Sequence, residues 1–156
     1  VMVKYKDLES GKVLQYLIDR FNKDRTPEIF YSVLRCFRDS YVWIPCTVSS
    51  ISDDDIKKFS KANARDTIVS SDNIKLKPDI LQSGDKFFFP VFSSVDQMGD
   101  YGRNFSKIEK HSFEAMGMAL AHKETIGIVV DAFTCPFIID KELFKIIENI
   151  PSNIEE

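Results

Sequence analysis

Thiols and imidazoles are the side chains best suited to nucleophilic or metal chemistry, and this chain has three cysteines and two histidines. A catalytic thiol needs its pKa lowered by a neighbouring base or a helix N-terminus. The sequence around Cys135, the cysteine that we expect to be most exposed, supplies neither. Cys36 falls on the apolar side of a predicted helix, so we expect it in the core. His111 and His122 flank another predicted helix, about 16 Å apart along its axis, which is too far for a shared metal ion. We therefore expect no catalytic centre, no metal site and no cofactor.

A second set of polar residues follows the most apolar segment of the chain. Ser93 and Ser94 come directly after that segment, and Tyr101 and Arg103 lie a few residues further on, among glycines. Loops that follow a central strand are where α/β folds place ligands. These four residues, together with Asp131, are therefore the candidates for a ligand or interaction site. The loop lacks the Lys-Ser/Thr ending of a phosphate-binding turn, and a plain surface turn is the simpler interpretation.

Charged residues gather in one short segment, where the triplet Asp53–Asp55 precedes Lys57, Lys58, Lys61 and Arg65. Acids before bases complement the dipole of a short helix, and the triplet lacks the alternating acids of a calcium loop. The basic side chains predict a solvated helix face, because too few aromatic residues lie among them for nucleic-acid stacking. A net charge of −3 and a pI of about 5.5 also argue against a nucleic-acid partner.

Length and composition predict one folded domain. A chain of 156 residues can bury roughly two thirds of its unfolded surface, and 44% hydrophobic with 29% charged residues is typical of a globular protein. No apolar run reaches the roughly 20 residues of a membrane span, and the N-terminal residues lack the apolar core of a signal peptide. Three widely spaced cysteines make no disulfide framework. We expect a cytoplasmic domain over residues 1–156, with its core at about 10–150.

The segment Lys86–Phe92 predicts the centre of the fold. It places four phenylalanines and a valine around Pro90, a composition that favours a buried strand over a helix. Gly84 and its neighbours predict a turn, so residues 80 to 92 read as a β-hairpin. The apolar run Ile126–Val130 predicts a second central strand. We expect residues 86–92 and 126–131 to be the most buried strands.

The remaining elements follow from periodicity and caps. Apolar residues at helical spacing predict a helix from Ser10 to Phe21, and Thr26-Pro27 is a start signal for a second helix, which gives a helical hairpin. Further strands are expected at 41–48 and 137–139, and a loop is expected at 99–104. Helices should follow Ser112 and Asp140, with Leu120 and Ile146 facing inward, and residues 152–156 should fray.

Four of these segments, in this order, resemble the N-terminal domain of the SseB family, the enhanced serine sensitivity proteins. They are the helical hairpin with Tyr41-Val42-Trp43-Ile44-Pro45, the run Phe88-Phe89-Pro90-Val91-Phe92-Ser93-Ser94, the helix from Ser112 into Gly127-Ile128-Val129-Val130-Asp131, and Phe137-Ile138-Ile139 with the closing helix. The resemblance covers about residues 10 to 150. Asp131-Ala132 departs from it, because family members tend to carry Asn-Pro there.

The resemblance implies a single α/β domain with a mixed sheet of about five strands and no established catalytic centre. We expect a non-enzymatic interaction or accessory domain that binds another protein or its own copy, with no nucleic-acid or membrane partner. The alternative is a small-molecule sensor or enzyme with a pocket near Ser93–Arg103.

Overall fold

The computed structural model describes residues 2–50, 68–69 and 74–155. The helices are α1 (Tyr5–Leu8), α2 (Lys12–Lys23), α3 (Pro27–Asp39), α5 (Ser112–Ala121), α6 (Phe144–Asn149) and the 3-10 helices η2 (Val95–Asn104) and η3 (Lys141–Leu143). The strands are β1 (Val3–Lys4), β2 (Tyr41–Ser50), β3 (Ile68–Val69), β4 (Ile74–Pro78), β5 (Leu81–Ser83), β6 (Lys86–Val91), β7 (Ser106–His111), β8 (Thr125–Val130), β9 (Phe137–Asp140) and β10 (Ile154–Glu155). The predicted α/β class is confirmed. The predicted helix at Asp53–Asp55 and its basic face lie outside the described residues.

The strands are divided between sheets where one mixed sheet was expected. One sheet has the order β5-β6-β8-β9 and is mixed, because β6 and β8 are parallel while the outer pairs are antiparallel. A second, antiparallel sheet has the order β3-β4-β2-β7, and β1 pairs with β10. Phe92, just beyond β6, exchanges two backbone hydrogen bonds with Trp43 of β2, at 2.8 and 2.9 Å. This pairing joins the two larger sheets.

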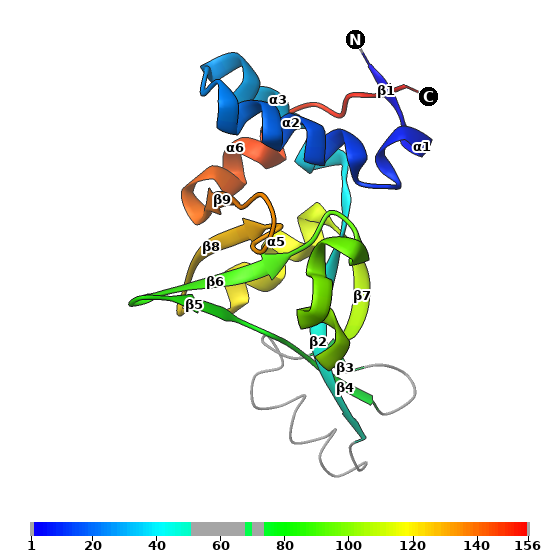
Figure 1. Cartoon of the computed structure of the whole chain (residues 1–156), viewed down its shortest axis with the longest axis vertical. Helices are drawn as coiled ribbons and strands as arrows, with labels where there is room; N and C mark the ends of the chain where they lie inside the picture. The colour runs from blue at the N-terminus through cyan, green and yellow to red at the C-terminus, as the bar shows by residue number, and fades with distance from the viewer. Residues whose placement is uncertain (1, 51–67, 70–73, 156) are drawn as a thin grey trace.

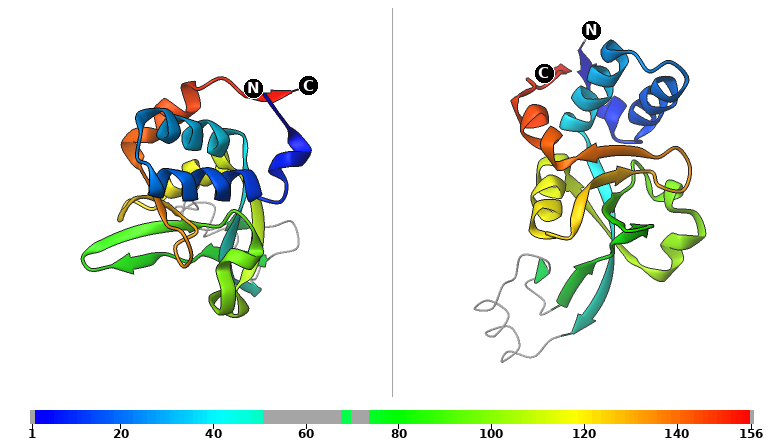
Figure 2. Two further views of the ribbon diagram at one scale, coloured as in Figure 1. Left: turned by 45° about the horizontal axis from the view of Figure 1, so that its top comes forward. Right: turned by 90° about the vertical axis from the view of Figure 1, so that its left-hand side faces the viewer.

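The helical hairpin forms as predicted. Thr26 caps α3 by accepting a hydrogen bond from the backbone N–H of Ile29 at 3.2 Å, and Pro27 occupies the first helical turn. Figure 1 shows α2 and α3 packed together above the mixed sheet, with α6 beside them and β2 running down from the end of α3. The two described chain ends lie side by side through the β1–β10 pair (Figure 2).

The two strands predicted to be most buried are neighbours in the mixed sheet. Phe89 and Val91 of β6 are fully buried, as are Ile128 and Val130 of β8. These side chains join one core with apolar residues of α2, α3, α5 and β2. The turn at Gly84 connects β5 to β6 as the sequence predicts, with Gly84 at φ +62°. The phenylalanine-rich strand therefore organises the core.

Three local predictions are wrong. The segment 99–104 is the second half of the 3-10 helix η2, which is broken at Gly99. Leu120 and Ile146 are about half exposed, because the buried stripes of α5 and α6 fall on residues three and four apart that exclude them. Residues 154–155 pair with β1 instead of fraying: Asn153 donates its N–H to the Asp39 carboxylate at 2.7 Å, and this contact holds the segment in place.

Candidate functional site

The carboxyl ends of the parallel strands β6 and β8 bring Ser93 and Asp131 together. Asp131 accepts hydrogen bonds from the Ser93 N–H at 2.8 Å and from the Ser93 hydroxyl at 2.7 Å. Gln15, in the first turns of α2, donates its side-chain amide to the Ser93 hydroxyl at 2.8 Å and lies 3.4 Å from the Ser94 hydroxyl. We call Gln15, Ser93 and Asp131 the strand-end cluster. Three of the five candidate residues thus lie close together: Ser93, Ser94 and Asp131.

The backbone of Asp131 turns the chain out of β8. Its φ of +51° is the one positive value outside glycine in the described residues, and aspartate and asparagine tolerate this region best among non-glycine residues. Its carbonyl accepts from the N–H groups of Thr134 and Cys135, both at 3.2 Å. Burial raises the pKa of the Asp131 carboxyl, and the two hydrogen bonds from Ser93 oppose that shift. The side chain and the backbone of Asp131 therefore both stabilise the turn.

Two members of the strand-end cluster, Ser93 and Asp131, are buried, and Gln15 is partly buried. Ser93 is 2% exposed and Asp131 is 1% exposed. Gly11, at the start of α2, covers Ser93 so closely that a Cβ atom at position 11 would lie 2.2 Å from the Ser93 carbonyl oxygen. These polar groups bond to one another, and the Gln15 amide ties α2 to the mixed sheet.

Tyr101 and Arg103 have their polar partners outside this cluster. The Tyr101 hydroxyl donates to the Asp79 carboxylate, and burial, followed by Asp79, raises the tyrosine pKa. Its ring packs against Phe105 and Phe133, with ring centres 4.8 Å apart in both pairs. The Arg103 side chain is 82% exposed and pairs with Asp100 at 3.4 Å. Arg103 lines a surface depression of about 380 Å³ that none of the other four candidate residues lines. The five candidates do not form one pocket.

Two of the three thiols lie in the core. Cys36 and Cys46 are buried, as expected for Cys36, and burial raises their pKa values to about 11 and about 12. Cys135 is the least buried cysteine, as predicted, and its sulfur accepts a hydrogen bond from the Asn22 side chain at 3.0 Å. Both buried thiols are thus protonated at neutral pH.

The histidines flank α5 and have separate structural surroundings. His111 caps the helix by accepting the Phe113 N–H at Nδ1, 3.1 Å away. Burial and the Arg38 charge lower the pKa of His111. His122 lies at the other end, 4% exposed, against the Phe89 ring. Within the described ranges, no group of three or more His, Cys, Asp or Glu residues could hold a metal ion.

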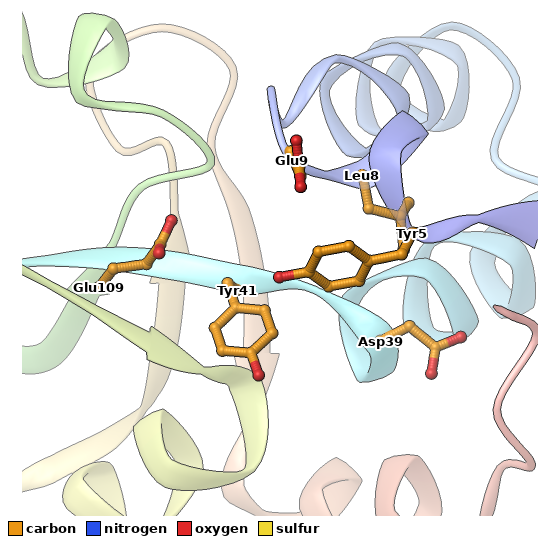
Figure 3. Close-up of a pocket in the computed structure, with 6 residues that line it drawn as sticks. All are labelled: Tyr5, Leu8, Glu9, Asp39, Tyr41 and Glu109. Carbon is orange, nitrogen blue, oxygen red and sulfur yellow. The ribbon is translucent and has the colours of Figure 1, made fainter.

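A pocket of about 180 Å³ opens beside the N-terminal segment. Its lining comes from α1 and the residue after it, the end of α3, β2 and β7: Tyr5, Leu8, Glu9, Asp39, Tyr41 and Glu109. We call it the tyrosine pocket. The Tyr5 and Tyr41 rings meet edge to face, with centres 6.0 Å apart and planes at 86°. Figure 3 shows the Tyr5 ring between Glu9 and Tyr41, with its hydroxyl on the side of Glu109.

The carboxylates of the tyrosine pocket have different roles. Asp39 is 2% exposed, and each of its carboxylate oxygens accepts a hydrogen bond, one from the Arg38 guanidinium at 2.9 Å and the other from the Asn153 N–H at 2.7 Å. Figure 3 shows its carboxylate pointing away from Glu9 and Glu109. The pKa of Tyr5 is raised by desolvation first and then by Tyr41, Glu9 and Glu109. The charges of Glu9 and Glu109 thus disfavour ionisation of the Tyr5 hydroxyl.

Sequence reasoning did not find this pocket or Gln15. Tyr5, Tyr41 and Glu109 come from three distant segments, and each reads alone as an ordinary surface residue. Gln15 follows Leu14 in an amphipathic helix, and its polar side chain gives no signal of a partner near residue 93.

Comparisons of the chain with protein-family models, with curated proteins and with solved structures give no match. None of the helices in the described ranges combines the length and apolar character needed to cross a bilayer.

Proposed function

We propose that this chain is a non-enzymatic interaction domain, of the kind implied by the resemblance to the SseB N-terminal domain, and that it binds a protein through the tyrosine pocket. The observation that carries this proposal is the pairing of two exposed tyrosines in one concave site: Tyr5 is 46% and Tyr41 is 42% exposed. Tyrosine is enriched at protein interfaces and among the residues that dominate binding energy, because its ring buries a large area and its hydroxyl still bonds.

The strand-end cluster supports the same proposal, because its contacts indicate a structural role. Its serine and carboxylate are the polar side chains that the sequence places at the usual ligand position of an α/β fold. Because Ser93 and Asp131 are buried and bonded to each other, they hold α2 in place and are not offered to a substrate. The alternative function, a small-molecule pocket near Ser93–Arg103, would have to use the depression that Arg103 lines, because neither serine lines it.

Site-specific photo-crosslinking tests the proposal. A benzophenone amino acid is placed at position 41 and, as a matched control, at Tyr31, which is 45% exposed on α3 and does not line the pocket. We expect a discrete adduct from position 41 alone. The identified protein, once purified, should bind the wild-type domain at least about tenfold more tightly than the Tyr41→Ala variant, as for an interface anchor. A cross-linked dimer of the chain itself would identify the partner as a second copy. Equal adducts from both positions, or none, would reject the tyrosine pocket as the binding surface.

A further inference from the structure

The tyrosine pocket carries two carboxylates without a counter-charge. Glu9 and Glu109 are exposed at its rim, and neither makes an ion pair with any side chain in the described part of the chain. Two basic groups that contact residues of the pocket are committed elsewhere. Arg38 is bound to Asp39. The ring of His111 packs edge to face on Tyr41 at 5.1 Å, and burial lowers its pKa and so disfavours its charged form.

The aromatic rings add to the attraction of these carboxylates for a cation. The face of a tyrosine ring attracts a cation within about 6 Å of its centre, and the edge-to-face pair leaves ring surface bordering the pocket. A metal ion is the wrong occupant, because the described residues contain no group of three metal ligands close enough to share one. A cation that also has apolar surface would contact both the rings and Leu8.

We propose that the tyrosine pocket binds the ammonium group of a lysine side chain on the partner protein. This inference rests on the proposed function and names the chemistry of its partner. The volume of about 180 Å³ is below the roughly 300–1,000 Å³ of sites that enclose a whole small molecule, so it suits one side chain. Glu9 and Glu109 lie on different sides of Tyr5 (Figure 3). A compact ammonium can donate in several directions at once, whereas the planar guanidinium of arginine suits a single carboxylate held bidentately.

The test is a titration of the isotope-labelled chain, followed through its backbone amide resonances, with the peptide acetyl-Ala-Lys-Ala-amide. We expect saturable shifts at Tyr5, Glu9, Tyr41 and Glu109, and at least tenfold weaker binding of the same peptide with an acetylated lysine side chain. The double variant E9Q/E109Q should weaken binding at least fivefold. The control E148Q removes an exposed charge on α6, outside the pocket, and should leave binding unchanged.

Two results would overturn the inference: equal binding of the acetylated peptide, which would make the pocket an apolar slot, or binding of n-butylammonium without binding of the peptide. The experiment also separates this inference from the proposed function. A specific crosslink from position 41 together with no peptide binding would leave the interaction domain standing and remove lysine as its ligand. Peptide binding without any crosslinked partner would keep lysine as the ligand of the pocket and count against the interaction domain.

Discussion

Replacement of Asp131 by alanine is expected to lower the free energy of unfolding by about 3 kcal/mol. The variant leaves the buried N–H and hydroxyl of Ser93 without their acceptor, and each unsatisfied buried group costs about 1–3 kcal/mol. Alanine is also disfavoured at the positive φ of this position, by roughly 1–2 kcal/mol. Removal of a desolvated carboxylate offsets part of this loss. Urea unfolding followed by the fluorescence of Trp43, the single tryptophan, gives the difference directly.

Asp131→Asn is the matched control for this variant. Asparagine keeps an oxygen that can accept the Ser93 N–H and tolerates the same backbone conformation, so we expect a loss of less than about half that of alanine, since one acceptor is retained. Equal losses for the two variants would show that the hydrogen bonds to Ser93 contribute nothing to stability.

The wild type and D131N should differ in how their stability depends on pH, with a defined sign. Burial raises the pKa of the Asp131 carboxyl in the folded chain above its ordinary value of 3.8. As the pH falls, the folded state takes up the proton first, so the cost of the buried charge, fully present at pH 7, is relieved as the pH falls through the folded pKa. The stability of the wild type relative to D131N should therefore rise between pH 7 and pH 4. A relative stability that stays constant or falls would contradict this assignment.

Replacement of Gly11 by alanine should cost about 3 kcal/mol, from two sources. A side chain at φ +75° is disfavoured by roughly 1–2 kcal/mol. The new Cβ atom would also lie 2.2 Å from the Ser93 carbonyl oxygen, so α2 must shift away from the strand-end cluster and lose the contact made by Gln15. The melting temperature and the urea midpoint should both fall.

Gly84→Ala carries the first source alone, so the difference between the two alanine variants measures the second. Gly84 has a similar φ of +62°, but a Cβ atom there would meet nothing within 4 Å. We expect it to lose only the conformational part, roughly 1–2 kcal/mol. If the two alanine variants are equally stable, the close contact between α2 and the end of β6 is absent in solution.

The elements of the fold that the sequence predicts are those with a strong local or compositional signal. Thr26-Pro27 specifies its helix start without help from the rest of the chain, and the phenylalanine-rich strand has no stable position other than a buried one. The arrangement of the strands in separate sheets was not predictable, because it depends on pairings between residues far apart in the sequence. The pairing of Trp43 with Phe92, which joins the two larger sheets, is one of these. The segment 99–104 looked like a loop because glycine disfavours helices, yet the break at Gly99 separates two short helical pieces.

The candidate site, like the fold, was predictable only in part. Ser93 and Asp131 come together because both follow strands that are adjacent and parallel, and the general rule for such strand ends was enough to select them. The rule does not say whether the place is open. Here Gly11 and Gln15 close it, and both come from a helix whose docking position no local pattern specifies. The tyrosine pocket has the same origin, since it exists only where three separate segments meet.

Amide hydrogen exchange at Ser93 tests the central claim, that Ser93 and Asp131 form a closed structural contact. The Ser93 N–H is buried and bonded to Asp131 at 2.8 Å, so it should exchange only with an opening free energy close to that of global unfolding. The amides of Phe89 and Val91 should behave in the same way, and that of Asp85, in the exposed turn, should exchange far faster. If the Ser93 amide exchanges as freely as that of Asp85, the contact between Ser93 and Asp131 opens in solution and this claim is wrong.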